Sequence, residues 1–162
     1  MAAVDYFLKI DGIEGESQDK THKNEIECLS WSWGATNAGS MGVGSGGGTG
    51  KVQVQDAHFS FHVCAASPKL AEFCHTGKHI SKAVLVCRKA GGDSPLEYLK
   101  MTLSDILISS YQTGGSQGDI LPVDQVSINF TKIEKEYKAQ TSTGTGAGTV
   151  KFGWDVKQNA KV

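Results

Sequence analysis

Apolar and polar residues alternate along most of the chain, and this alternation constrains the fold more than any other feature of the sequence. A period of two residues is typical of strands that bury one face and expose the other. The cleanest example is segment 150–157, whose apolar positions are Val150, Phe152, Trp154 and Val156. About eight such segments, one short helix and glycine-rich connections without β–α–β spacing predict a mainly β protein, an antiparallel sandwich or barrel.

Two strands near the N-terminus show the same pattern. In the first, the residues that share one face are Val4, Tyr6, Leu8 and Ile10. In the second, Leu29, Trp31 and Trp33 share a face, and Ser30 and Ser32 lie on its reverse. We therefore expect the second strand to bury three large side chains in the core and to present hydroxyl groups on its other side.

The alternation changes phase at two places. In the segment 52–63, apolar residues occupy even positions at Val52 and Val54 and odd positions from Ala57 onward, so the phase slips near residues 55–56. A second slip separates Phe130 from Ile133. Because one inserted residue reverses the facing of every later side chain, we predict a β-bulge or a sharp bend at the first place and a bulge at the second.

The segment 67–77 is the one convincing helix. Ser67 is the expected N-cap, Pro68 suits the first turn, and Gly77 is a typical stop. Its apolar face is formed by Leu70, Phe73 and Cys74. A helix of about two turns does not hold together alone, so we expect it to close one end of the sheet structure.

Length and charge exclude several classes of protein. A chain of 162 residues is predicted to form a single domain spanning residues 1–162. Its 16 basic and 17 acidic side chains create no strong field for nucleic acid or an anionic membrane. The N-terminus shows no signal-peptide core, so we expect the protein to begin in the cytoplasm. We interpret Cys28, Cys64, Cys74 and Cys87 as reduced, buried thiols.

Three apparent motifs do not predict chemistry. Gly42, Gly44 and Gly47 match a dinucleotide fingerprint, but a strand follows where a helix is required. Residues 114–118 match the nucleophile elbow G-x-S-x-G but precede another strand. The possible zinc ligands lack the C-x-x-C or H-x-x-x-H spacing that would form half of a tetrahedral site. They are His62, Cys64, Cys74, His75 and His79. We therefore predict no catalytic residue, no metal and no cofactor.

The whole chain resembles the Hcp family, the tube proteins of bacterial type VI secretion systems. The N-terminal part of the resemblance is FLKIDGIEGESQDKTHKNEIECLSWSWG followed by GKVQVQD. The middle part is GKHISKAVLVCRKAGG followed by EYLKMTLSDILISSYQTGGS, and VKFGWDVKQN completes it. Several long segments in the same order are far more specific than any single glycine motif.

The resemblance implies an antiparallel β-barrel of two packed sheets with one short α-helix. It also implies that copies form hexameric rings, which stack into a tube inside a contractile sheath with a spike protein at its tip. Sheath contraction would expel the tube, so the protein would end outside the cell. Small effector proteins are the implied cargo of the ring's channel. The alternatives left open are a dedicated effector carrier and, more remotely, a small zinc enzyme.

The resemblance also suggests which residues have these roles. Ser32, followed by Ser30, is our candidate for the channel wall and for effector binding. Gly91 and Lys157 are candidates for the rim where rings stack. The candidate loop for contact between rings or subunits comprises Met41, Gly42, Val43, Gly44, Ser45, Gly46, Gly47 and Gly48.

The energetics of the glycine-rich segment 41–50 support a contact role. Fixing ten such residues costs on the order of 10 kcal/mol of backbone entropy or more. Offsetting that cost needs roughly 400 Å² of apolar burial at about 25 cal/mol per Å². Met41 and Val43 are its only apolar side chains apart from glycine. We therefore expect the segment to become ordered only where another copy covers it.

Overall fold

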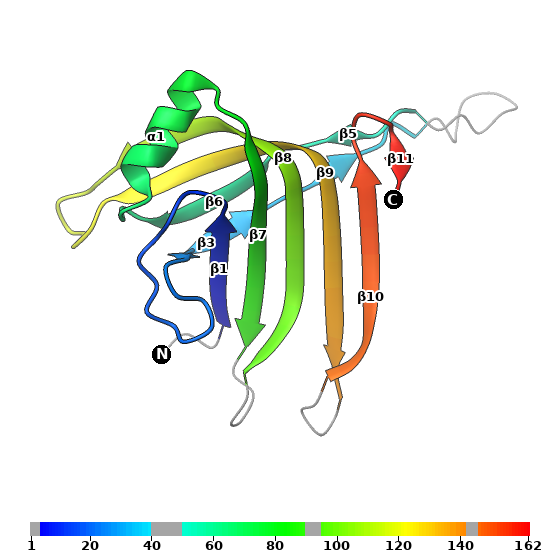
Figure 1. Ribbon diagram of the computed structural model, residues 1–162, viewed down its shortest axis with the longest axis horizontal. Helices are drawn as coiled ribbons and strands as arrows, with labels where there is room; N and C mark the ends of the chain where they lie inside the picture. The colour runs from blue at the N-terminus through cyan, green and yellow to red at the C-terminus, as the bar shows by residue number, and fades with distance from the viewer. Residues whose placement is uncertain (1–3, 40–49, 90–94, 142–145) are drawn as a thin grey trace, which may run out of the picture.

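The computed structural model describes residues 4–39, 50–89, 95–141 and 146–162, and within them the chain is mainly β with one helix (Figure 1). The candidate contact loop 41–48 and the candidate rim residue Gly91 lie outside the described residues. The strands are β1 (Val4–Ile10), β2 (Ile26–Glu27), β3 (Ser30–Ser32), β4 (Ala35–Thr36), β5 (Gln53–Val54), β6 (Ala57–His62), β7 (Ile80–Lys89), β8 (Leu96–Gly114), β9 (Val123–Gln140), β10 (Gly146–Asp155) and β11 (Ala160–Lys161), and the helix is α1 (Ser67–Thr76).

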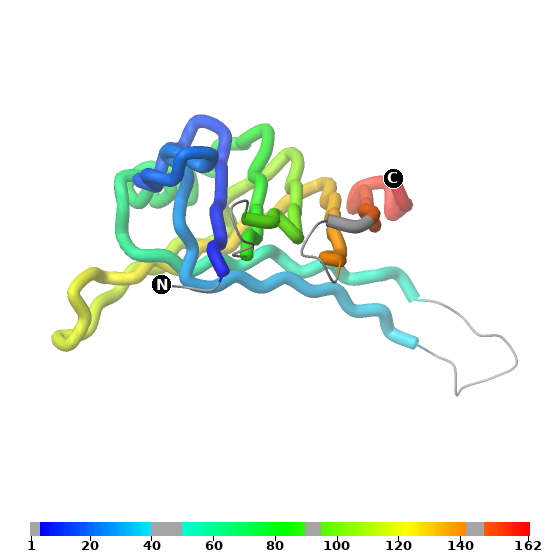
Figure 2. The backbone as a smooth tube through the Cα atoms, turned by 90° about the horizontal axis from the view of Figure 1, so that it is seen from below, coloured from blue at the N-terminus to red at the C-terminus, as the bar shows by residue number. Residues whose placement is uncertain are grey.

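Nine of these strands form one antiparallel sheet. Its main path runs β11-β10-β9-β8-β7-β1-β2, and β6 joins it by pairing with β9 on one side and with β3 on the other. The remaining two strands, β4 and β5, form a separate ribbon. Figure 2 shows this ribbon leaving the body of the molecule at one end, as the continuation of β3 and β6.

The long strands β8 and β9 turn this single sheet into two layers. One half of the β8–β9 hairpin pairs with β7 and β10, and the other half pairs with β6. The hairpin bends between the two halves at Asp105, whose φ of 49° lies in the left-handed region. The Thr131 hydroxyl stabilises the bend by donating a 3.1 Å hydrogen bond to the Ser104 carbonyl.

One continuous segment, 26–32, joins the two layers at one edge, but within the described residues the outer strands of the sheet do not pair, so the barrel is not closed by hydrogen bonds. This segment pairs with β1 at its start and with β6 at its end. Between those ends, the Cys28 amide donates to the Tyr6 carbonyl and the Leu29 amide donates to the Ser60 carbonyl. The predicted antiparallel, mainly β fold with one short helix is confirmed, but its two layers are halves of one bent sheet.

Neither of the two changes in the phase of the apolar alternation is caused by an inserted residue. At the first, strand β5 ends at Val54 and a new strand begins at Ala57, so the chain changes strand instead of bulging. At the second, β8 and β9 keep one register across the bend, and both change facing together. The predicted bulge there was wrong, and the register shift in this hairpin lies between Ile108 and Ser110.

The helix begins one residue earlier than its sequence suggested. Its N-cap is Ala66, and the Ser67 hydroxyl instead accepts a 3.0 Å hydrogen bond from the Cys64 amide. Ser67 is thus used by the turn that leads into the helix, and the predicted cap was wrong. Gly77 does end the helix in a left-handed conformation, and its amide donates to the Phe73 carbonyl. No helix in the described residues is long and apolar enough to cross a membrane.

The core lies between the two layers and under α1. Its largest fully buried side chains include Phe61, Leu8, Ile26, Leu70, Leu85 and Met101. Trp31, Trp33 and Trp154 are partly buried and pack against it. The predicted burial of Leu29 is wrong, because 51% of it is exposed, and on the apolar face of β10 Val150 and Phe152 are also 70% and 43% exposed.

Candidate functional site

A polar surface covers the outer side of the layer formed by β3, β6 and the distal halves of β8 and β9. Strand pairing arranges it in two rows: Ser30, Ser60, Gln125 and Gln112 in one, and Ser32, His58, Ser127 and Ser110 in the other. These eight residues are called the polar face below. It arises because Trp31, Phe59 and Val126 alternate with them along their strands and point into the core.

The polar face is rich in hydroxyl and amide groups. Seven of its eight side chains are Ser or Gln, and the eighth is His58. The His58 Nδ1 atom and the Ser127 hydroxyl are hydrogen-bonded at 2.7 Å. Where the face meets the bend, the Asp56 carboxylate accepts hydrogen bonds from Ser109 at 2.7 Å and from Asn129 at 2.8 Å. Such a surface can hydrogen-bond to water or to a polypeptide without a strong preference for one sign of charge.

An ion cluster fixes the loop that follows β1. The Arg88 guanidinium donates two hydrogen bonds to the Asp19 carboxylate, at 2.7 and 3.0 Å, and one to Asp5 at 3.0 Å. It also lies over the Phe7 ring, 4.8 Å from the ring centroid. The hydrogen bonds from Arg88 hold the pKa of the Asp19 carboxyl well below its ordinary value. Arg88 therefore ties β1, the 11–25 loop and the end of β7 together.

His22 makes a second link between this loop and the sheet. Its ring stacks on Phe7 with a centroid distance of 4.4 Å and an angle of 9°. Its Nδ1 atom lies 2.8 Å from a Glu25 carboxylate oxygen, and its Nε2 atom lies 2.7 Å from a Glu97 carboxylate oxygen. Phe7 is thus held between His22 and Arg88, and the loop is fixed to both β1 and β8.

Acid should weaken the protein partly through Asp19. Because its folded-state pKa lies below the unfolded value of about 3.9, the stabilisation is complete above that value. Below it the unfolded chain binds a proton that the folded chain does not, so stability falls as pH falls. We expect Asp19→Asn to flatten this loss, measured as the free energy of urea unfolding between about pH 7 and about pH 3. Parallel curves for the variant and the wild type would contradict the assignment.

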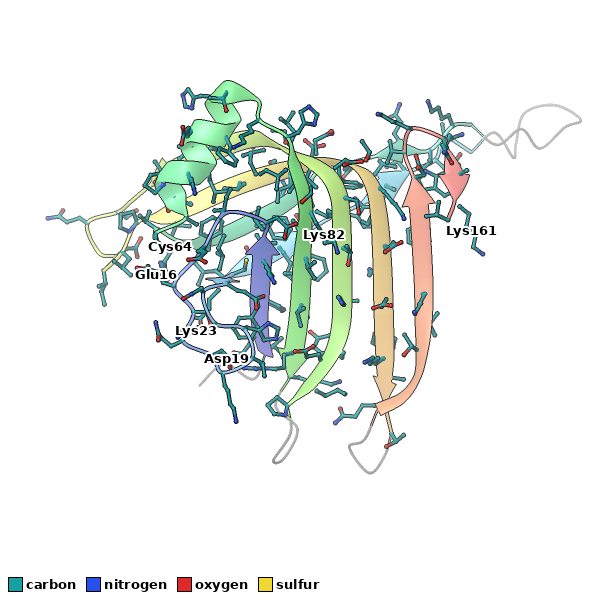
Figure 3. The ribbon with its side chains drawn as sticks, viewed as in Figure 1. Glu16, Asp19, Lys23, Cys64, Lys82 and Lys161 are labelled. Atoms are coloured by element: carbon teal, nitrogen blue, oxygen red, sulfur yellow. The ribbon has the colours of Figure 1, made fainter. Side chains whose placement is uncertain are left out.

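A cleft of about 410 Å³ opens beside the ion cluster, between β1, the 26–29 segment and residues 62–64. Its described lining residues include Asp5, Glu16 and Glu27 but no Lys or Arg. Leu29 and Leu121 line it with about half of each side chain exposed. Figure 3 shows Glu16 and Cys64 near one another at this cleft, and Lys161 at the opposite end of the molecule.

Three of the four cysteines are poor nucleophiles. Burial raises the pKa of the Cys87 thiol to about 11, and it also raises the pKa of Cys28 and Cys64. All four cysteines are free, as expected, but only Cys87 is fully buried. In the described ranges no group of three or more His, Cys, Asp or Glu side chains gathers closely enough to hold a metal ion.

Sequence reasoning located part of this site. Ser30 and Ser32 lie on the polar face and are exposed, and Lys157 is exposed in the turn between β10 and β11. The other six residues of the polar face were missed, although they alternate with apolar residues in the same way. The pattern along each strand identified a polar side, but only the strand pairing shows that these sides form one surface.

Comparison with known proteins gives a consistent result. A family model described as "Type VI secretion system effector, Hcp" matches residues 7–137. Protein hcp1 of Pseudomonas aeruginosa is 46% identical over 160 residues, which cover 98% of this chain and 99% of that protein. The crystal structure of Hcp1 from Salmonella typhimurium is 42% identical with a TM-score of 0.82, covering 99% of this chain and 100% of the other. A further structure, of a type six secretion system protein, is 29% identical over the same shares with a TM-score of 0.93.

Proposed function

The chain belongs to the Hcp family of type VI secretion system tube proteins, and we propose that its copies form hexameric rings that stack into the secretion tube. The tube lies inside a contractile sheath, carries a spike protein at its tip, and leaves the cytoplasm when the sheath contracts. The observation that best supports a channel is the polar face. It is a broad hydroxyl and amide surface on one bent layer, which suits a wetted wall along which a tube's contents move.

A second role for the same surface is the reception of small effector proteins inside the ring. The polar face offers donors and acceptors at regular spacing, and the His58–Ser127 pair adds a directional group. Uncharged polar side chains bind other proteins weakly enough to release them later. In this role, the ring would be both a component of the tube and a carrier of effectors.

Changing Ser32 tests the carrier role. Ser32→Arg places a long cation on the polar face, where it should exclude a protein partner without affecting the barrel. We expect rings to form normally while effectors of the producing cell no longer co-purify with them. Ser81→Arg, at an exposed serine on β7, is the matched control and should retain the effectors. If both variants retained the effectors equally, the polar face would be ruled out as the effector site.

Lys157 tests the stacking of rings. Its side chain is exposed in the turn between β10 and β11, and we propose that this turn faces the next ring, together with Gly91 and the 41–48 segment. Lys157→Glu should leave rings intact but reduce the number and length of tubes seen by electron microscopy. Lys82→Glu, at an exposed lysine on β7, is the control. Tubes of normal length with Lys157→Glu would rule out this contact.

A further inference from the structure

The core side of the sheet continues past the barrel without a cover. Val150 pairs with Tyr137, and Trp154 pairs with Ile133, so strand alternation places all four side chains on the same side of the sheet. Ile133 is fully buried and Trp154 packs against the core, yet 46% of Tyr137, 70% of Val150 and 43% of Phe152 are exposed. These three exposed residues are called the overhang.

The opposite side of β9 and β10 has the polar character of a solvated surface. Lys151 pairs with Glu136 at 3.1 Å, and Lys132 pairs with Glu134 at 3.2 Å. Thr149, on the same side, is exposed. The overhang is therefore on the more apolar side of an amphipathic pair of strands, which it shares with Lys135, and the described residues leave it partly uncovered.

A second exposed apolar feature lies at the tip of the β8–β9 hairpin. Ile120 is 98% exposed and Leu121 is 49% exposed, in the loop that joins the two strands. A turn bond from the Asp119 amide to the Ser116 carbonyl and a bond from the Val63 amide to the Pro122 carbonyl fix this loop. Ile120 and Leu121 are called the tip. A fixed loop presents its apolar side chains at little further entropic cost on binding.

The tip and the overhang lie at opposite ends of the molecule. Figures 1 and 2 agree that the 115–121 loop projects from one end and that β10 and β11 lie toward the other, where the β4–β5 ribbon also leaves the molecule. One chain therefore cannot cover its own overhang with its own tip. Two copies arranged head to tail can do so, and repeated contacts of this heterologous kind produce rings or filaments.

The charges around the two features are complementary. Of the six lysines in residues 132–161, Lys135 lies on the overhang side, where it pairs with Phe152, whereas Lys132 and Lys151 lie on the opposite side in ion pairs with Glu134 and Glu136. At the other end, Asp119 is the only charged residue of the 115–122 loop, and the adjacent cleft is lined by Asp5, Glu16 and Glu27 without Lys or Arg among its described residues. Lys135 of one copy would thus meet an acidic surface of the next.

We propose that the tip of one copy docks against the overhang of the next and that this contact joins neighbouring subunits within a ring. The proposal rests on the proposed ring assembly and names the two surfaces that make it. Ile120 and Leu121 lie against Tyr137, Val150 and Phe152, and Lys135 beside the overhang faces the acidic cleft.

Cysteine cross-linking tests the contact and its direction. The variants are Ile120→Cys, Val150→Cys and the double variant, each oxidised with oxidised glutathione and compared with wild type on a non-reducing gel. Both positions are highly exposed, so neither change should disturb the barrel. We expect the double variant to form a covalent ladder, a mixture of the two single variants to form dimers only, and each single variant alone to match wild type.

Other results would overturn the contact. Rings that form normally while the double variant yields no ladder would reject the tip–overhang contact but leave the proposed function intact. Dimers from one single variant alone would indicate an isologous contact and would also reject it. The control is the double variant Gln117→Cys with Thr149→Cys. Gln117 lies on the same loop as Ile120, and Thr149 lies on the other side of β10 from Val150, so this variant should give no ladder. A wild-type chain that forms no rings would instead reject the proposed function.

Discussion

Phe61→Ala is expected to lower the free energy of unfolding by about 3–5 kcal/mol. The Phe61 side chain is fully buried on β6, with Ser60 and His62 beside it on the opposite face. Truncation removes most of an aromatic ring and leaves a cavity, because the strands on both sides of β6 are paired and cannot collapse into it. The measurement is the free energy of unfolding from urea titration followed by fluorescence.

His62→Ala is the matched control for that change. It alters the next residue of the same strand, whose side chain is exposed, and we expect a change within about 0.5 kcal/mol. Phe61→Leu should fall between the two, since it retains much of the volume. A loss below about 1 kcal/mol for Phe61→Ala would show that the layer behind the polar face is not packed as described.

Arg88→Met is expected to destabilise the protein by roughly 3 kcal/mol. The side chain of Arg88 is only 13% exposed, and its guanidinium accounts for three hydrogen bonds to Asp5 and Asp19. Methionine retains packing against Phe7 but leaves the Asp19 carboxylate, 21% exposed, without its cation. Unpaired, partly buried charge is costly, so the 11–25 loop should loosen from β7.

The double variant Arg88→Met with Asp19→Asn separates charge from packing. If the unpaired carboxylate is the main cost, the second change should restore a substantial part of the loss. Hydrogen exchange should then show the amides of the 11–25 loop protected again. Additive losses in the two variants would mean that the ion pair contributes little and that Arg88 acts through its contact with Phe7 alone.

The alternation pattern was sufficient to predict an antiparallel β fold, but it did not predict which apolar faces are covered. Val150, Phe152 and Leu29 all follow the pattern, and all three are exposed. A period of two residues identifies the apolar side of a strand. Whether the same chain reaches that side depends on where the sheet bends, and this is decided by contacts distant in sequence.

The bend itself illustrates the same limit. Its signal in the sequence is a phase change on β9, which one strand alone cannot distinguish from a bulge. The distinction requires the partner strand, because β8 changes facing at the same level and no residue is inserted. Ser67 is a local example. Its hydroxyl could cap the helix or accept a hydrogen bond within the preceding turn, and in the structure it does the latter.

The polar face shows what sequence can contribute to a site of this kind. Ser30 and Ser32 can be predicted from one short strand, because they alternate with large apolar residues. His58, Ser60, Gln125 and Ser127 join them only through the pairing of β3 with β6 and of β6 with β9. Individually, each is an ordinary polar residue, three of them exposed or half-exposed and Ser127 buried, and their common location is a property of the fold.

Negative-stain electron microscopy of the purified chain tests the central claim most directly. Copies that meet head to tail and curve their polar faces inward should appear as annular particles with an open centre. Compact particles the size of one barrel, with no opening at any protein concentration, would contradict the account.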